Sequence, residues 1–175
     1  MITSIASYLR YFDAVHRRAV RDIGALPKEA DGWAPVAGSG EGAWSINVLV
    51  GHMAGSRLYF ASAYRGEGWI SPPPPDTSKF ESWLPALEES ARQFHAALTG
   101  TPVDWLTRKV QMIDSDGALS GWRVLMMMLE HDIHHRSQIE TYAGINGWPV
   151  MDIYNRAAET IASLQATQRE KYRGD

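Results

Sequence analysis

Two histidines stand at a spacing that suits metal binding. His131 and His135 are four positions apart in a segment whose apolar residues recur with a helical period. On a helix, side chains four apart lie one above the other, with Cβ atoms about 6 Å apart. Two imidazoles placed in this way can bind one divalent ion at about 2.1 Å each. Such a pair also arises without a metal, so its meaning depends on a further ligand.

His52, in an earlier segment that also reads as a helix, is the candidate for that third ligand. Three protein ligands leave one coordination position open, which is typical of catalytic metal sites. Gly55, about one turn further on, either makes room for a bound molecule or allows close helix packing. Imidazole accepts zinc, nickel, copper and iron, so the ligand type does not choose the metal. The predicted metal ligands are therefore His52, His131 and His135.

Other polar residues near the histidine pair have two interpretations each. Gln138 and Tyr142 continue the stripe of His131 and His135, where they could orient a bound molecule or form hydrogen bonds in the core. Arg136 could pair with a substrate carboxylate, or with the acidic residues Asp132 or Glu140 in a surface ion pair. His134 is rotated by about 100° from His135 and is expected to face the flank or solvent. It could also pair with His131 three positions earlier.

A hydrolytic interpretation of the same segment stays open. The pattern His131-Asp132-x-x-His135 resembles the His-Glu-x-x-His of zinc peptidases, with Asp132 in the place of the general base. Aspartate is one methylene shorter, which reduces its reach. A peptidase also needs a downstream ligand, for which Glu159 is the candidate. A third possibility is a non-catalytic bundle that binds a metal or a small molecule.

The hydrophobic period predicts an all-α protein, a four-helix bundle with a C-terminal helix. Breaks at glycine and proline delimit the helices. The run Pro72–Pro75 cannot be helical and suggests a long crossover between the second and third helices. Residues 109–113, followed by Asp116-Gly117, could form a short β-hairpin before the fourth helix. The helices are expected at residues 2–24, 45–64, 79–98, 120–143 and from 152 onward.

Bulk composition excludes several classes of protein. The 175 residues suit one domain spanning 1–175, and 45% of them are hydrophobic. A net charge of −3 argues against nucleic acid and against a membrane surface as partners. There is no cysteine, so any thiol in the chemistry must come from outside the chain. We see no signal peptide and no membrane-spanning run, and we expect a cytoplasmic protein.

Three segments together resemble the DinB/YfiT-like superfamily of metal-dependent enzymes. Residues 43–53 resemble its tryptophan and N-cap serine followed by a histidine on the next helix stretch. Residues 131–139 resemble its paired histidines followed by Arg and Gln, and residues 147–152 are similar to its turn into the final helix. The order and separations match over nearly the whole chain. One departure is Asn47, where many members have an acidic residue, and this affects capping more than chemistry.

The resemblance implies a four-helix bundle with a long crossover, often dimeric. It also implies a metal held by three histidines, which correspond here to His52, His131 and His135. Zinc and nickel both occur in that superfamily, and iron is possible. Characterised relatives transfer or isomerise small molecules with low-molecular-weight thiols such as bacillithiol or mycothiol. The expectation is therefore a homodimeric, thiol-dependent S-transferase or isomerase acting on a small-molecule substrate.

Overall fold

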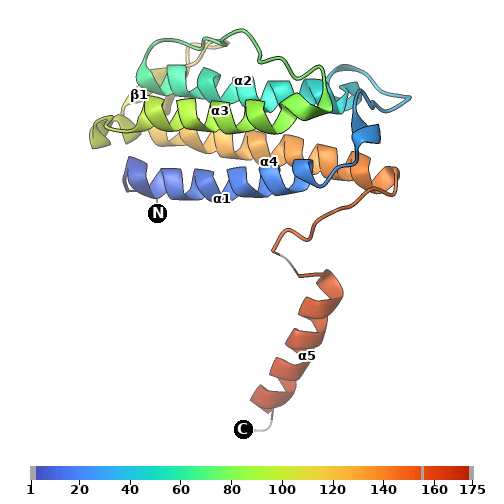
Figure 1. Ribbon diagram of the computed structural model, residues 1–175. Coiled ribbons are helices and arrows are strands. Elements are labelled where there is room, and N and C mark those ends of the chain that lie inside the picture. Colours follow the sequence, from blue (N-terminus) through green and yellow to red (C-terminus); the bar gives the residue numbers. More distant parts are fainter. Residues whose placement is uncertain (1–2, 155, 174–175) are drawn as a thin grey trace.

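The computed structural model describes residues 3–154 and 156–173, and its core is a four-helix bundle, as predicted (Figure 1). The four helices are α1 (Ile5–Gly24), α2 (Ile46–Arg65), α3 (Phe80–Leu98) and α4 (Gly121–Ile145). Ser4 caps α1 through a hydrogen bond from the amide of Ser7. Short 3-10 turns lie at η1 (Lys28–Ala30), η2 (Gly40–Ala43) and η3 (Val103–Leu106).

The connection between α2 and α3 is the long crossover that the prolines predict. Gly66 caps the C-terminus of α2, with a left-handed φ of 80°. The chain then runs back along the bundle, so that α3 lies beside α2 in the same direction (Figure 1). An extended proline segment advances about 3.1 Å per residue and therefore spans a helix length with few residues. Thr77 fastens the end of the crossover to α2, because its hydroxyl donates to the Asn47 carbonyl at 2.8 Å.

The predicted hairpin is also present. β1 (Lys109–Gln111) pairs antiparallel with β2 (Ala118–Ser120), and β2 leads directly into α4. The indole of Trp69 in the crossover donates to the Gln111 carbonyl at 2.7 Å. This bond ties the start of the crossover to the hairpin end of the bundle.

The bundle core has two apolar halves with a polar layer between them. One half includes Phe12, Phe60 and Phe94, and the other includes Leu49, Trp83 and Ile139. At the level between them each helix contributes a buried polar side chain, and these residues are His16, Arg57, Ser90 and Asp132. The predicted metal ligands on α2 and α4 lie close to this layer in the sequence. The layer therefore sets how the two helices face each other at the site.

The C-terminal helix begins later than the sequence suggests. The expected start at Asp152 is wrong, because residues 153 and 154 form a turn and α5 spans Ala158–Arg173. α5 extends away from the bundle, and none of its residues is buried (Figure 1). The segment before it contacts the bundle, where the Tyr154 ring lies 5.5 Å from the Arg18 guanidinium. The part of the predicted first helix at residues 1–2 lies outside the described residues.

A candidate three-histidine metal site

His52, His131 and His135 converge at the interface of α2 and α4. The ring centroids of the three pairs are 4.7, 4.8 and 4.5 Å apart. One nitrogen of each ring lies within 4.8 Å of the other two. The Nε2 atoms of His52 and His131 are 2.8 Å apart. Three imidazoles in this arrangement form a donor set that could hold a divalent metal ion.

A chain of hydrogen bonds fixes the tautomer of His135. The Tyr142 hydroxyl donates to the Gly42 carbonyl at 3.0 Å and accepts from Gln138 Nε2 at 2.9 Å. Gln138 Nε2 also donates to the Glu41 carbonyl at 2.6 Å, which leaves its Oε1 facing His135 Nδ1 at 3.0 Å. An amide oxygen only accepts, so Nδ1 must carry the proton. The lone pair of His135 therefore lies on Nε2, the nitrogen that a metal binds.

Burial keeps the three rings in the neutral form that metal binding requires. Desolvation lowers the pKa of His131 to about 3, and the neighbouring histidines add to the effect. Desolvation also lowers the pKa values of His52 and His135. Protonated imidazole cannot bind a metal. His131 Nδ1 is buried and has no hydrogen-bond partner among the described residues. The contact of this ring with His52 is made through its other nitrogen, Nε2.

Asp132 belongs to the core rather than to the site. Its carboxylate is fully buried and accepts from Arg57 Nε and Nη2 at 3.1 and 2.9 Å. The remaining Arg57 nitrogen, Nη1, donates to the Leu87 carbonyl and to Ser90 Oγ. One position beyond His131, a side chain points about 100° away on the helix. Asp132 is therefore not placed as the general base that the peptidase interpretation needs.

The remaining candidates separate into those near the cluster and those away from it. Arg136 is buried against α1, where its Nε is 3.5 Å from both Asp22 and Glu140. Glu159, the ligand that the peptidase interpretation requires, lies exposed on α5 and outside the histidine cluster. His134 is exposed, as expected, with its ring edge-on to His135 at 4.9 Å.

A pocket of about 480 Å³ opens beside the cluster. It lies between α2 and the crossover, and both His52 and His131 line it. Gly55 also lines it, and a Cβ at this position would meet no atom within 4 Å. Of the two interpretations of Gly55, the structure thus supports open space rather than close helix packing. Trp44 covers the other side of His52, edge-on at 5.0 Å.

Sequence reasoning missed Glu41, which the loop before α2 brings to the site. Glu41 lines the pocket, and its carboxylate lies within 4.8 Å of the ring nitrogens of His134 and His135. The segment Gly38–Gly42 reads as a flexible lead-in, and nothing local indicates where it folds. Its position depends on the bonds from Gln138 and Tyr142, which are about 100 residues away.

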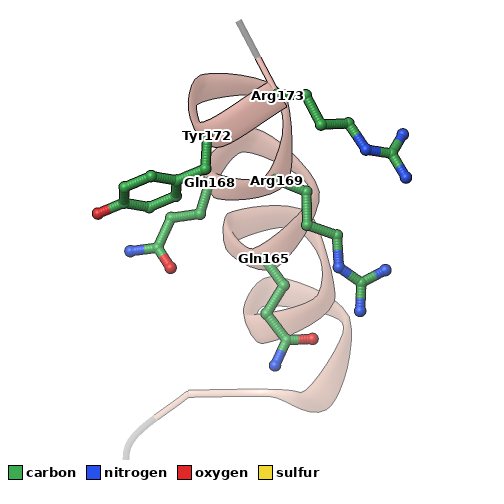
Figure 2. Close-up of a pocket in the computed structure, with 5 residues that line it drawn as sticks. All are labelled: Gln165, Gln168, Arg169, Tyr172 and Arg173. Carbon is green, nitrogen blue, oxygen red and sulfur yellow. The ribbon is translucent and has the colours of Figure 1, made fainter. Parts of the chain in front are cut away.

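A second hollow, on α5, is not comparable. Its lining residues Gln165, Gln168, Arg169, Tyr172 and Arg173 all come from successive turns of this one exposed helix (Figure 2). Ligand sites are concave and bury most of a bound molecule. The face of a single exposed helix does not provide this enclosure.

The fold and the histidine cluster together describe a helical bundle with a candidate metal centre. The sequence matches the model of the DinB family over residues 1–170, and the chain belongs to that family. A DinB-like protein from Bacillus cereus is similar in structure, with a TM-score of 0.70 and 17% identity. That match covers 87% of this chain and 99% of the other.

A second solved structure gives the same result. The DinB-like protein YjoA from Bacillus subtilis has a TM-score of 0.64 and 17% identity, covering 86% of this chain and 99% of the other. At this identity the likeness concerns the fold alone. A search of curated proteins gave no match. Within the described part of the chain, no helix combines the length and apolar character needed to span a bilayer.

Proposed function

We propose that this protein is a metal-dependent S-transferase or isomerase. It uses an external thiol and acts on a small-molecule substrate. The observation that carries the proposal is the convergence of three neutral imidazoles beside an open pocket. The metal is a divalent transition ion, zinc or nickel, with iron as a further candidate. When bound, such an ion acts as a Lewis acid that lowers the pKa of a thiol at its open position.

The side chains of this protein supply the rest of the arrangement. His52 and His131 present their rings from two helices, and Gln138 holds the proton of His135 on Nδ1. Trp44 and Phe60 flank the rings, at 5.0 Å from His52 and 5.8 Å from His131. Apolar walls of this kind exclude water and strengthen electrostatic interactions at a reacting centre.

Thiol chemistry is preferred to hydrolysis because of Asp132. The acid that would serve as general base in a His-Asp-x-x-His site is instead bound to Arg57 in the core. The chain also has no cysteine, so a thiol nucleophile must be a separate molecule. We propose a homodimer as the assembly, with neither nucleic acid nor membrane as a partner.

Two measurements test the proposal. Elemental analysis of protein purified without a metal-affinity step should find close to one transition metal ion per chain. His52→Ala should lose it, whereas His134→Ala, an exposed neighbour outside the three-ring cluster, should keep it. The metal-loaded protein should then consume thiol in a panel of thiols and electrophiles, and the chelated protein should not. Full metal content in His52→Ala, or no thiol consumption with any pair, contradicts the proposal.

A further inference from the structure

The pocket beside the histidine cluster has a charge pattern that favours one class of ligand. Among the described residues that line it, Glu41 carries the only formal charge, and there is no lysine or arginine. Arg57 lies nearby in the sequence but is fully buried and bound to Asp132. In the metal-free protein, an anionic group in this pocket would meet a carboxylate and no lysine or arginine to offset it. A cationic group would meet a partner of opposite charge.

The other walls of the pocket are mainly apolar or lack side chains. Tyr59 and Phe60 of α2 form an aromatic wall, Pro72 and Pro74 come from the crossover, and Gly55 leaves space between them. Tyr59 is further supported by Trp69, with ring centroids 5.2 Å apart. Aromatic faces accept apolar groups and attract cations. The walls therefore suit an apolar body that carries a positive charge.

The position of Glu41 defines where that charge belongs. Its backbone carbonyl is held by Gln138 at 2.6 Å, and its carboxylate lies within 4.8 Å of a ring nitrogen of His135. Gln138 thus links the loop that carries Glu41 to the histidine cluster. One small molecule can therefore place an ammonium group at the Glu41 carboxylate and a second group, a few covalent bonds away, at the histidine cluster.

We propose that this pocket binds a small molecule with an apolar body and an ammonium group, with the ammonium at Glu41. Within the proposed function, on which this assignment of substrate rests, the preferred thiol is one that carries an amino group near its sulfur. Specificity then comes from the carboxylate on the loop and from the absence of basic residues. A divalent ion on the histidines would add its own positive charge, so the contribution of Glu41 is isolated in the metal-free protein.

Binding of three matched probes to the metal-free protein tests the inference without metal or thiol chemistry. Benzylammonium, benzyl alcohol and benzoate share one apolar body and differ in charge. Calorimetric titration of the full chain in the presence of a chelator should give the order benzylammonium, benzyl alcohol, benzoate. One exposed ion pair accounts for a preference of about fivefold over the alcohol.

Variants test whether Glu41 causes the preference for benzylammonium. Glu41→Gln should bind benzylammonium and benzyl alcohol equally, and Glu41→Lys should prefer benzoate. Glu29→Gln, which removes an exposed carboxylate in η1, should behave like the unchanged protein. Gly55→Leu should bind none of the probes yet stay folded, because leucine favours a helix more than glycine and its Cβ enters open space.

The outcomes separate this inference from the proposed function. A preference for benzoate in the unchanged protein, or an undiminished ammonium preference in Glu41→Gln, overturns the inference, as does absence of binding by all probes. An ammonium preference without metal content or thiol consumption supports the pocket assignment and contradicts the thiol enzyme. Where thiol consumption occurs, Glu41→Gln should lower kcat/KM for cysteamine relative to 2-mercaptoethanol by about fivefold. An unchanged ratio overturns the assignment of the amino group.

Discussion

Gln138 determines which nitrogen of His135 can bind a metal. Its amide oxygen is fixed toward the ring because its nitrogen donates to the Glu41 carbonyl and to Tyr142. We expect Gln138→Ala to lower metal affinity by 10- to 100-fold, as is typical for loss of a partner that orients a ligand. Competition with a chromogenic chelator measures this change.

The matched control for Gln138 is Ser137→Ala, which changes the preceding exposed residue. Its metal affinity should equal that of the unchanged protein. Circular dichroism should show the same helix content in both variants, because Gln138 is not part of the apolar core. Equal metal affinity in Gln138→Ala and Ser137→Ala would show that the tautomer is set by other groups.

Glu140 makes the stability of the bundle depend on pH. Desolvation and a hydrogen bond with Asp22 raise its pKa from 4.5 to about 7, with Arg136 and Arg21 acting in the opposite direction. A raised pKa means that the folded chain keeps a proton that the unfolded chain has lost. The stabilising contribution is complete below pH 4.5 and disappears as the pH rises toward 7.

Glu140→Gln removes this titration. The melting temperature of Glu140→Gln relative to that of the unchanged protein should therefore rise between pH 4.5 and 7.5. Thermal unfolding at a series of pH values measures the difference between the two curves. A difference that is constant, or that falls with pH, rules out this role of Glu140.

At the scale of helices, the buried pair of Arg57 and Asp132 joins α2 to α4 beside the histidine cluster. Both side chains are fully buried, and Arg57 also binds α3 through the Leu87 carbonyl and Ser90. Removal of one partner leaves an uncompensated charge in the core, which costs about 3–5 kcal/mol. Asp132→Ala should therefore lower the free energy of unfolding by about that amount.

Urea unfolding measures this loss, and a double variant tests its cause. Arg57→Met combined with Asp132→Leu removes both charges and should recover most of the stability, because an apolar replacement of a buried pair is often nearly neutral. If the double variant is as unstable as Asp132→Ala, the cost comes from packing rather than from the unpaired charge.

The sequence predicted what depends on local spacing. The four-residue step of His131 and His135, the proline crossover and the hairpin turn are all visible within short windows. Asp132 could not be assigned in this way, because its role depends on which helix faces it and Arg57 is 75 residues distant. Glu41 was missed for the same reason, since a glycine-rich loop has no period that indicates its position.

At the scale of the whole molecule, an exposed apolar groove on the bundle is the candidate surface for a dimer. A groove of about 820 Å³ runs between the start of α1, η3 and α4, and Tyr11, Val103 and Trp122 line it. These three side chains are 58%, 62% and 46% exposed, respectively, although all are large and apolar. Contiguous exposed apolar surface of this kind is typical of an interaction site. Soluble homo-oligomers are most often two-fold dimers, in which the same patch is buried twice.

We therefore expect the protein to sediment as a dimer and Trp122→Glu to sediment as a monomer. A charge at the centre of a buried apolar contact is costly, whereas on a free surface it is not. Tyr172→Glu provides the control, because Tyr172 is an exposed aromatic residue on α5, away from the groove. Tyr172→Glu should remain dimeric.

Analytical ultracentrifugation at several concentrations distinguishes the two variants. A dimeric Trp122→Glu or a monomeric unchanged protein contradicts this interface. Metal content should be the same in both variants, because the three histidines of each site come from a single chain.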